Sequence, residues 1–407
     1  MRRVTTAWLA ACGVMTLVAA AAGARADALG DRLAPHVGQA LDLVELGTGR
    51  RFVRPVLEGV QARDGRVTAL RVRAEGETRV TTLPLAGIVK IVAGRETVHE
   101  GESKGTSASQ AKARKARADY EQKTAASLER MKAAGVTPWP PLTAEEQAAE
   151  VQQLEAFIAE VRKLFPRLQV VQTHEFIVAT DIPPAQMAGY VAGLDAMHDA
   201  LCDLYAIPRG EPVWRGKCLV IAFLSQDDFL AYEERFHDVA AADYHGLCHQ
   251  SSDGRVITAC HRGGDAPAFA HMLVHETSHG FNHRWLSAQR LPSWLNEGIA
   301  EWVGAKVVPA SDQVTLKEAQ ALQFMRARGD LGPEFFDRHP IDAVQYGIAS
   351  GLVRFLVKQD PRKFATFVQG IKEGAPAEES LEKAYGGTLD DLVKAYGTAI
   401  GVPALAR

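Results

Sequence analysis

The chain of 407 residues lacks an excess of either charge: 46 Lys and Arg stand against 49 Asp and Glu, for a formal net charge of −3. This balance gives no electrostatic reason to expect a nucleic acid or an anionic membrane as partner. The sequence also lacks an internal repeat, a nucleophile elbow and a phosphate-binding loop, so solenoid folds, serine-hydrolase chemistry and P-loop chemistry are not indicated. Beyond its first residues, no apolar run approaches the ~20 residues of a membrane-spanning helix.

Cysteine is scarce, with five residues and no C-x-x-C pair, which argues against a cysteine zinc site. Four cysteines follow the N-terminal segment, at Cys202, Cys218, Cys248 and Cys260. An even number in an exported protein predicts two disulfides, with pairing between sequence neighbours favoured. Cys248 and Cys260 flank the turn signal Asp253-Gly254, which suits a hairpin. Free buried thiols are the alternative.

The N-terminus has the pattern of a secretory signal peptide over residues 1–26. A basic start, Met1-Arg2-Arg3, precedes an apolar run and the small-residue cleavage site Ala24-Arg25-Ala26. The pattern predicts export to the periplasm, the cell envelope or the medium. A less favoured alternative is a lipid anchor at Cys12, because Leu9-Ala10-Ala11-Cys12 resembles a lipobox.

The remaining composition, with 47% hydrophobic and 23% charged residues, is globular, and the length predicts more than one unit. Alternating short runs over 27–100 predict a small β domain, with an SH3- or Sm-like barrel as the analogy. Residues 101–150 are charged and alanine-rich and predict a helical linker. Residues 151–407 predict a mixed domain of a few strands followed by many helices. The predicted fold class is therefore α+β.

The segment His275-Glu276-Thr277-Ser278-His279 is an H-E-x-x-H motif in a stretch of helical spacing. Residues i and i+4 lie on one face of a helix, so His275 and His279 can direct their imidazoles to one metal ion. Glu276 is displaced around the helix and suits a general base that acts on water. The motif alone arises by chance often enough that it needs support from its context.

That support comes from Trp294-Leu295-Asn296-Glu297-Gly298-Ile299-Ala300-Glu301, which opens a second predicted helix. Glu297 lies eighteen positions after His279, which leaves enough chain for a turn and an antiparallel helix. A catalytic zinc site has three protein ligands and one open position, and Glu297 is the natural third ligand. Glu301, one turn further on, suits a carboxylate that accepts the second ring N–H of a ligand histidine.

H-E-x-x-H followed by W-L-N-E-G-x-A-E resembles the gluzincins, the thermolysin and aminopeptidase-N clan of zinc peptidases, and especially their peptidase-MA-like bacterial relatives. The resemblance is strong over residues 270–305, weaker over 165–400 and absent over 27–150. It implies a zincin-like catalytic domain, Zn²⁺ as cofactor and a peptide or protein as substrate. It also implies His275, His279 and Glu297 as ligands, Glu276 as base and Glu301 as supporting acid.

Tyr346, at the start of an apolar helical stretch, is similar to the gluzincin tyrosine that donates a hydrogen bond to the oxyanion. A helix-capping role for Tyr346 is the alternative. The aminopeptidase segment G-x-M-E-N is missing, which favours endopeptidase over aminopeptidase action. The strand expected at 255–261 is predicted to be the edge that pairs with substrate.

The predicted function is that of an exported zinc peptidase. The alternative is a non-catalytic or narrowly specific zinc-binding protein of the cell envelope. The other histidines near the motif are expected to have surface, supporting or hydrogen-bonding roles rather than to bind metal, and for the three near the predicted hairpin a position along the cleft is the alternative. These are His245, His249, His261, His271 and His283.

Overall fold

The computed structural model describes residues 28–46, 51–63, 66–73, 80–94, 96–100 and 107–407. The chain divides into two compact units, residues 1–106 and residues 107–407. The predicted signal peptide and Cys12 lie outside the described residues. Among the helices described, none combines the length and the apolar character needed to cross a membrane.

The first unit consists of a short helix, α1 (Ala28–Leu33), two 3₁₀ turns and seven described strands. The turns are η1 (Ala34–His36) and η2 (Leu85–Gly87). The strands are β1 (Leu43–Leu46), β2 (Arg51–Val53), β3 (Val56–Arg63), β4 (Arg66–Arg73), β5 (Val80–Pro84), β6 (Ile88–Ala93) and β7 (Glu96–Glu100). They form two antiparallel sheets, in the orders β2-β1-β6-β7 and β3-β4-β5.

The prediction of a small barrel is wrong, because the described strands of this unit form two open sheets that do not close into a barrel. Both sheets contribute to one core that includes Leu57, Leu70 and Ile91. A single isolated bridge, Ala40 with Val56, connects strand β3 to the segment before β1. Between β2 and β3 the backbone takes a left-handed φ of 48° at Arg54. Proline follows and has no N–H to donate, so the two strands do not continue as one.

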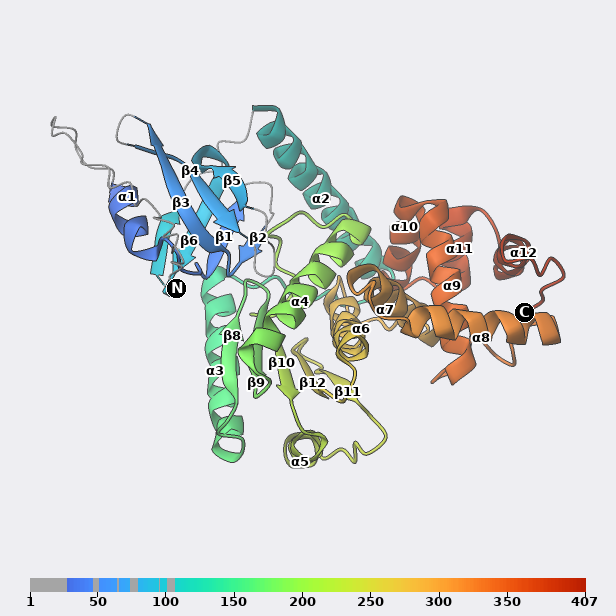
Figure 1. Cartoon of the computed structure of the whole chain (residues 1–407). Helices are drawn as coiled ribbons and strands as arrows, with labels where there is room; N and C mark the ends of the chain where they lie inside the picture. The colour runs from blue at the N-terminus through green and yellow to red at the C-terminus, as the bar shows by residue number, and fades with distance from the viewer. Residues whose placement is uncertain (1–27, 47–50, 64–65, 74–79, 95, 101–106) are drawn as a thin grey trace, which may run out of the picture. The chain divides into compact units, whose positions relative to one another are not determined.

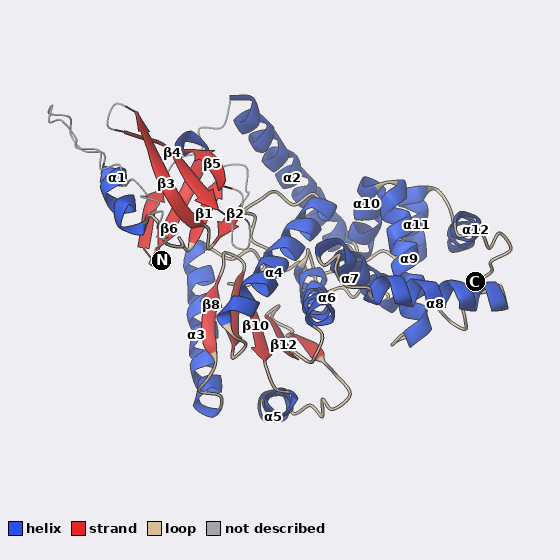
Figure 2. Ribbon diagram, in the orientation of Figure 1, coloured by secondary structure: helices blue, strands red, loops and turns tan. Residues whose placement is uncertain are grey.

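The second unit is mainly helical around one sheet (Figures 1 and 2). Its strands are β8 (Gln169–Gln172), β9 (Phe176–Thr180), β10 (Cys218–Phe223), β11 (Gly246–Gln250) and β12 (Val256–His261). Its helices are α2 (Ser107–Ala133), α3 (Ala144–Leu164), α4 (Pro184–Tyr205), α5 (Gln226–His237), α6 (Ala266–Arg284), α7 (Ser293–Val307), α8 (Gln313–Arg328), α9 (Ala343–Gln359), α10 (Pro361–Lys372), α11 (Ala377–Tyr385) and α12 (Leu389–Ala399). The two units together confirm the predicted α+β class.

The sheet of the second unit has the order β11-β12-β10-β9-β8 and lies between two layers of helices (Figure 1). Strands β9, β10 and β12 are parallel, and the outer strands β8 and β11 are antiparallel to their neighbours. Side chains such as Val178 and Val220 pack in the core formed with α4 and α6. Ile177 and Leu219, one residue away, pack with α3 and α5. Burial on both faces explains why β9 and β10 are continuous apolar runs.

The strand Val256–His261 was predicted to be a sheet edge, and this is wrong. Strand β12 pairs with β10 on one side and with β11 on the other. The edge on this side of the sheet is β11, which is antiparallel to β12. Any partner that adds a strand beside the H-E-x-x-H helix must therefore pair with β11.

The four described cysteines are free thiols, so the two predicted disulfides are not formed. The hairpin of β11 and β12 is present, but its register pairs Cys248 with Thr258 and Cys260 with Gly246. The hairpin is centred on Asp253, which leaves Cys248 two residues short of facing Cys260. Cys202 and Cys218 are buried in the hydrophobic core of the second unit.

The charged segment predicted to be a linker is helical over α2 and packs within the second unit. Arg130 of α2 makes two hydrogen bonds to Glu373, with N···O distances of 2.5 and 2.7 Å. After the helix, the Trp139 backbone N–H donates to the carbonyl of Leu286 and its indole N–H to that of His283, both at 2.9 Å. These contacts join the segment to the C-terminal ends of α10 and α6.

Candidate metal centre

Helix α6 carries the H-E-x-x-H motif. It begins after Asp265 with a proline in its first turn, where a missing N–H costs no intrahelical bond. Phe269, Leu273 and Phe281 anchor one side of the helix in the core. His275 and His279 are buried, each with a side chain about one tenth exposed.

Both histidines of the motif face one carboxylate oxygen on α7. Oε2 of Glu297 lies 3.1 Å from Nε2 of His275 and 3.4 Å from Nε2 of His279. Two ligand atoms bound tetrahedrally to one zinc ion, at about 2.0–2.1 Å each, are about 3.3–3.4 Å apart. The three side chains therefore form a group that could bind a metal ion, with separations close to those of a tetrahedral site.

Glu301 lies at the other nitrogen of His275, one helical turn beyond Glu297. Its Oε1 is 3.4 Å from Nδ1 of His275, and its Oε2 is 3.2 Å from Nε2 of His271. Lys317 of α8 also forms an ion pair with it. This is the arrangement in which a carboxylate fixes the orientation of a ligand imidazole through its second nitrogen.

His271, His275 and Glu301 form a second possible metal-binding group, which shares His275 with the first. The two groups use opposite nitrogens of that ring. The ammonium of Lys317 already balances Glu301, whereas among the described residues the ion-pair partners of Glu297 are the two histidines. The group at Glu297 is thus the better cation site.

The charges at the first group are strongly coupled. Burial disfavours protonated His279, but the carboxylate of Glu297 outweighs burial and raises the pKa of His279 to about 9. Glu297 is also buried, yet the two histidines lower the pKa of its carboxyl far below the usual range. Because a metal binds neutral imidazole, protons and a metal cation compete for this centre.

Glu276 lies beside the three candidate ligands without being one of them. Burial raises the pKa of its carboxyl above the usual value, and His275 and His279 partly oppose this. A carboxylate with a raised pKa is better matched to proton transfer near neutral pH. A Cβ added to Gly246 of β11 would lie 3.2 Å from Cγ of Glu276, so the edge strand passes directly beside this group.

Tyr346, in the first turn of α9, faces a cavity beside the candidate metal centre. The cavity has a volume of about 480 Å³ and is lined in part by His275, Glu276 and Tyr346. The centroids of the Tyr346 and His275 rings are 6.4 Å apart. Burial and the carboxylates of Glu297, Glu276 and Glu301 raise the pKa of the Tyr346 phenol, so the group remains a proton donor at neutral pH.

Three further residues line this cavity: His245 and His261, for which a cleft position was only the alternative, and Lys317, which was not predicted. Nδ1 of His245 lies 3.2 Å from Nε2 of His261 at the wall. Both histidines were expected to have surface or hydrogen-bonding roles. Lys317 could not be found from the sequence, because no spacing rule links α8 to the motif. His283, by contrast, points away from the candidate ligands and contacts the carbonyl of Ser251.

Gly298, next to Glu297, permits the close approach of α9 to α7. A Cβ at this position would lie 2.5 Å from the carbonyl oxygen of Ala349 and 2.6 Å from a methyl group of Val353. Replacing Gly298 with alanine is expected to lower the free energy of unfolding by about 1–3 kcal/mol, the usual cost of overpacking. Urea denaturation followed by circular dichroism measures this change.

The matched control is Gly189→Ala in α4, where no atom lies within 4 Å of an added Cβ. Alanine there is expected to be neutral or to stabilise by up to about 1 kcal/mol through its helix propensity. Equal effects of the two substitutions would show that the contact between α7 and α9 is not tight.

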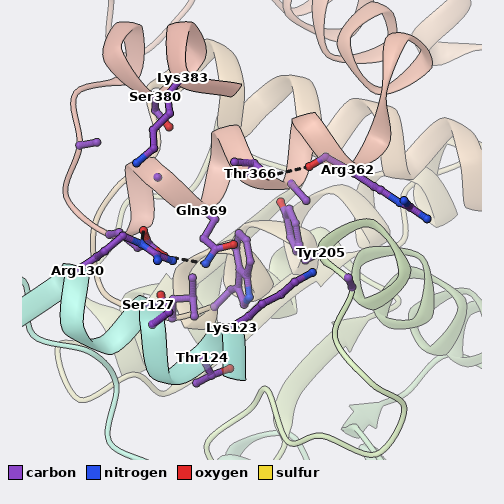
Figure 3. A pocket seen from close by; sticks show the side chains of 18 of the residues that line it. Lys123, Thr124, Ser127, Arg130, Tyr205, Arg362, Thr366, Gln369, Ser380 and Lys383 are labelled. Carbon is purple, nitrogen blue, oxygen red and sulfur yellow. Dashed lines mark hydrogen bonds and ion pairs between the residues drawn. The ribbon is translucent and has the colours of Figure 1, made fainter. Parts of the chain in front are cut away.

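A larger cavity, of about 910 Å³, lies between α2 and the C-terminal helices α10 and α11 (Figure 3). The side chains labelled in Figure 3 come mainly from these helices and include Lys123, Arg130 and Lys383. This cavity contains none of the three possible metal-binding groups found among the described residues. Its size alone does not make it the reaction site.

No protein-family model matches this chain, and no curated protein matches it at a significant level.

Proposed function

We propose that the second unit is a zinc-dependent peptidase of the gluzincin type, with a zincin-like fold. His275, His279 and Glu297 would hold the ion, and Glu301 would orient His275 from behind. The observation that carries the proposal is the convergence of two Nε2 atoms on one Glu297 oxygen, beside Glu276 and a cavity. Two histidines and a glutamate are a ligand set typical of catalytic zinc sites that keep one position open.

Zinc held by His275, His279 and Glu297 would supply Lewis acidity, which would lower the pKa of a water molecule and polarise the scissile carbonyl. Glu276 would act as the general base that takes a proton from water and passes it to the leaving amine. Tyr346 donates a hydrogen bond to the oxygen that becomes negative in the transition state. The raised pKa of Tyr346 supports this role, because only the protonated phenol can donate.

For the substrate we propose an extended peptide that adds to the edge strand β11. Its backbone groups would pair with those of β11, the antiparallel edge strand beside α6. Gly246 brings that strand next to Glu276. Together with the missing aminopeptidase segment, this favours cleavage within a chain, and the N-terminal pattern supports action outside the cytoplasm.

The proposal is tested by incubating the chain from residue 27 onward, which lacks the predicted signal peptide, with a peptide library in the presence and absence of a chelator. Mass spectrometry of the products identifies the bonds that are cleaved. Chelator-sensitive cleavage at internal bonds is expected. Stoichiometric zinc without any cleavage would favour a non-catalytic zinc protein of the cell envelope, and stepwise loss of N-terminal residues would indicate an aminopeptidase.

Replacing Tyr346 with phenylalanine is expected to lower kcat about 10²–10³-fold, the usual loss when one oxyanion donor is removed. Bound zinc and KM should change little, because the ring remains in place beside His275. Steady-state kinetics on a cleaved library peptide measure the effect. Tyr385→Phe is the control, since its hydroxyl contacts the Leu356 carbonyl and does not line the cavity. An unchanged kcat in the Tyr346 variant would assign Tyr346 to packing.

A further inference from the structure

A second group of histidine and glutamate side chains lies between α5 and β11, and we name it the α5–β11 cluster. It consists of Glu233 and His237, one helical turn apart on α5, and His249 on β11. One ligand atom from each residue lies within 4.8 Å of the other two. The rings of His237 and His249 are stacked in parallel, with centroids 3.5 Å apart. Because imidazole binds a metal ion within the plane of its ring, one of the two rings would turn about its Cβ–Cγ bond to share an ion with the other.

The charge of Glu233 is poorly balanced by protein groups. Its side chain is fully buried, and its ion-pair partner is His249, whose Nε2 lies 2.9 Å from Oε2. His249 carries a positive charge only when it is protonated. A buried carboxylate is costly unless it is paired with a cation or coordinates a metal. A divalent cation at this position would balance Glu233 at any pH where the imidazoles are neutral.

The surroundings of the cluster suit a bound ion. The hydroxyl of Tyr232 lies 3.0 Å from Nε2 of His237 and orients that ring. The side chain of His249 is 21% exposed and His237 is half-buried, so an ion can enter from solvent. Two imidazoles and one carboxylate suit zinc and related transition metals, whereas calcium and magnesium prefer oxygen ligands alone.

From this geometry we infer that the α5–β11 cluster binds a second divalent transition-metal ion, held by Glu233, His237 and His249. Three protein ligands leave a fourth position for water. The ion would tie the end of α5 to the edge strand. This inference does not depend on the proposed peptidase activity.

The α5–β11 cluster and the H-E-x-x-H centre lie on opposite faces of β11. Gly246 and Cys248 face α6, because Cβ atoms added at Gly246 and Gly280 would contact Glu276 and Cys248 respectively. Leu247 packs with the core beneath α5, and His249 reaches Glu233 of α5. A metal in the cluster would therefore fix the position of β11 from its α5 side, opposite the side on which β11 passes Glu276.

The test counts metal ions in the full-length chain. The protein is stripped of metal with a chelator, reloaded with zinc and separated from unbound zinc. The number of zinc ions per chain is then measured by elemental mass spectrometry. Two ions are expected in the natural chain, one in His249→Ala, one in His279→Ala and none in the double variant. His174→Ala is the control: His174 also contacts a glutamate, at 2.6 Å, but belongs to none of the three groups, so two ions should remain.

A second variant covers the possibility that His249→Ala does not fold. His237→Gln changes a half-buried side chain and is expected to weaken the second binding event at least 10-fold in a zinc titration. The first binding event should not change. A single ion per chain that His249→Ala still retains, two ions retained in His249→Ala, or two ions bound with unchanged affinity in His237→Gln would overturn the inference. A single ion that is lost in His249→Ala and retained in His279→Ala would support the inference and count against zinc at the H-E-x-x-H centre.

Discussion

Replacing Glu276 with glutamine is expected to leave zinc bound and to lower kcat roughly 10²–10⁴-fold, the range that general-base catalysis contributes. Glutamine has nearly the same shape but cannot accept the proton of the attacking water. The carboxylate of Glu276 is not among the candidate ligands, so metal content should stay the same. Steady-state kinetics and metal analysis of the same preparation measure the two quantities.

The control is Glu234→Gln, the same chemical change at an exposed position of α5. It should alter neither kcat nor metal content. An unchanged rate in Glu276→Gln would refute the assignment of the base. Loss of zinc from this variant would instead make Glu276 a ligand and require a different site.

Replacing His279 with alanine is expected to remove activity and the zinc ion of the H-E-x-x-H centre. Zinc affinity at the centre should fall more than 100-fold, beyond the 10–100-fold that is usual for residues that only support ligands. Because a metal that binds the folded state stabilises it, zinc at 1,000 times its Kd should add about 4.1 kcal/mol to the free energy of unfolding. Thermal unfolding with and without zinc should show this stabilisation in the natural chain and a smaller one in the variant, where only the α5–β11 cluster binds zinc.

His283→Ala is the matched control, since it lies four residues further along the same helix and contacts the Ser251 carbonyl. It should retain zinc, activity and the stabilisation by zinc. If His279→Ala kept full affinity, the ion would have to bind at His271, His275 and Glu301, the other group that includes His275.

The parts of the molecule that local rules govern were predictable. The spacing of His275 and His279 follows from helix geometry, and the run from Cys218 to Phe223 is apolar because both faces of β10 are buried. The meeting of Glu297 with both histidines was predicted from the length of chain between two helices, and the structure brings the three side chains together.

The parts that depend on pairing between distant segments were not predictable. Strand β12 lies inside the sheet because it pairs with β10, which is more than thirty residues earlier in the chain. The pattern of residues 255–261 does not indicate whether the strand lies inside the sheet or at its edge. The hairpin is centred on Asp253, whereas a direct pair of Cys248 and Cys260 would need a centre at Gly254. This difference of one residue in the centre shifts the register by two, and nothing in the local sequence fixes it. His249 was not predicted to bind metal, because Glu233 and His237 lie on a helix that only the tertiary fold brings close to it.

The position of α7 along its own axis has a consequence for the metal centre. Glu297 and Glu301 lie one turn apart and meet opposite nitrogens of His275. A slide of α7 by one pitch, about 5.4 Å, would exchange one carboxylate for the other. Two glycines oppose such a slide: Gly298 seats against α9 and Gly304 against the ring of His271. These two contacts fix the position of α7 and thereby determine that Glu297, and not Glu301, faces the Nε2 atoms of both His275 and His279.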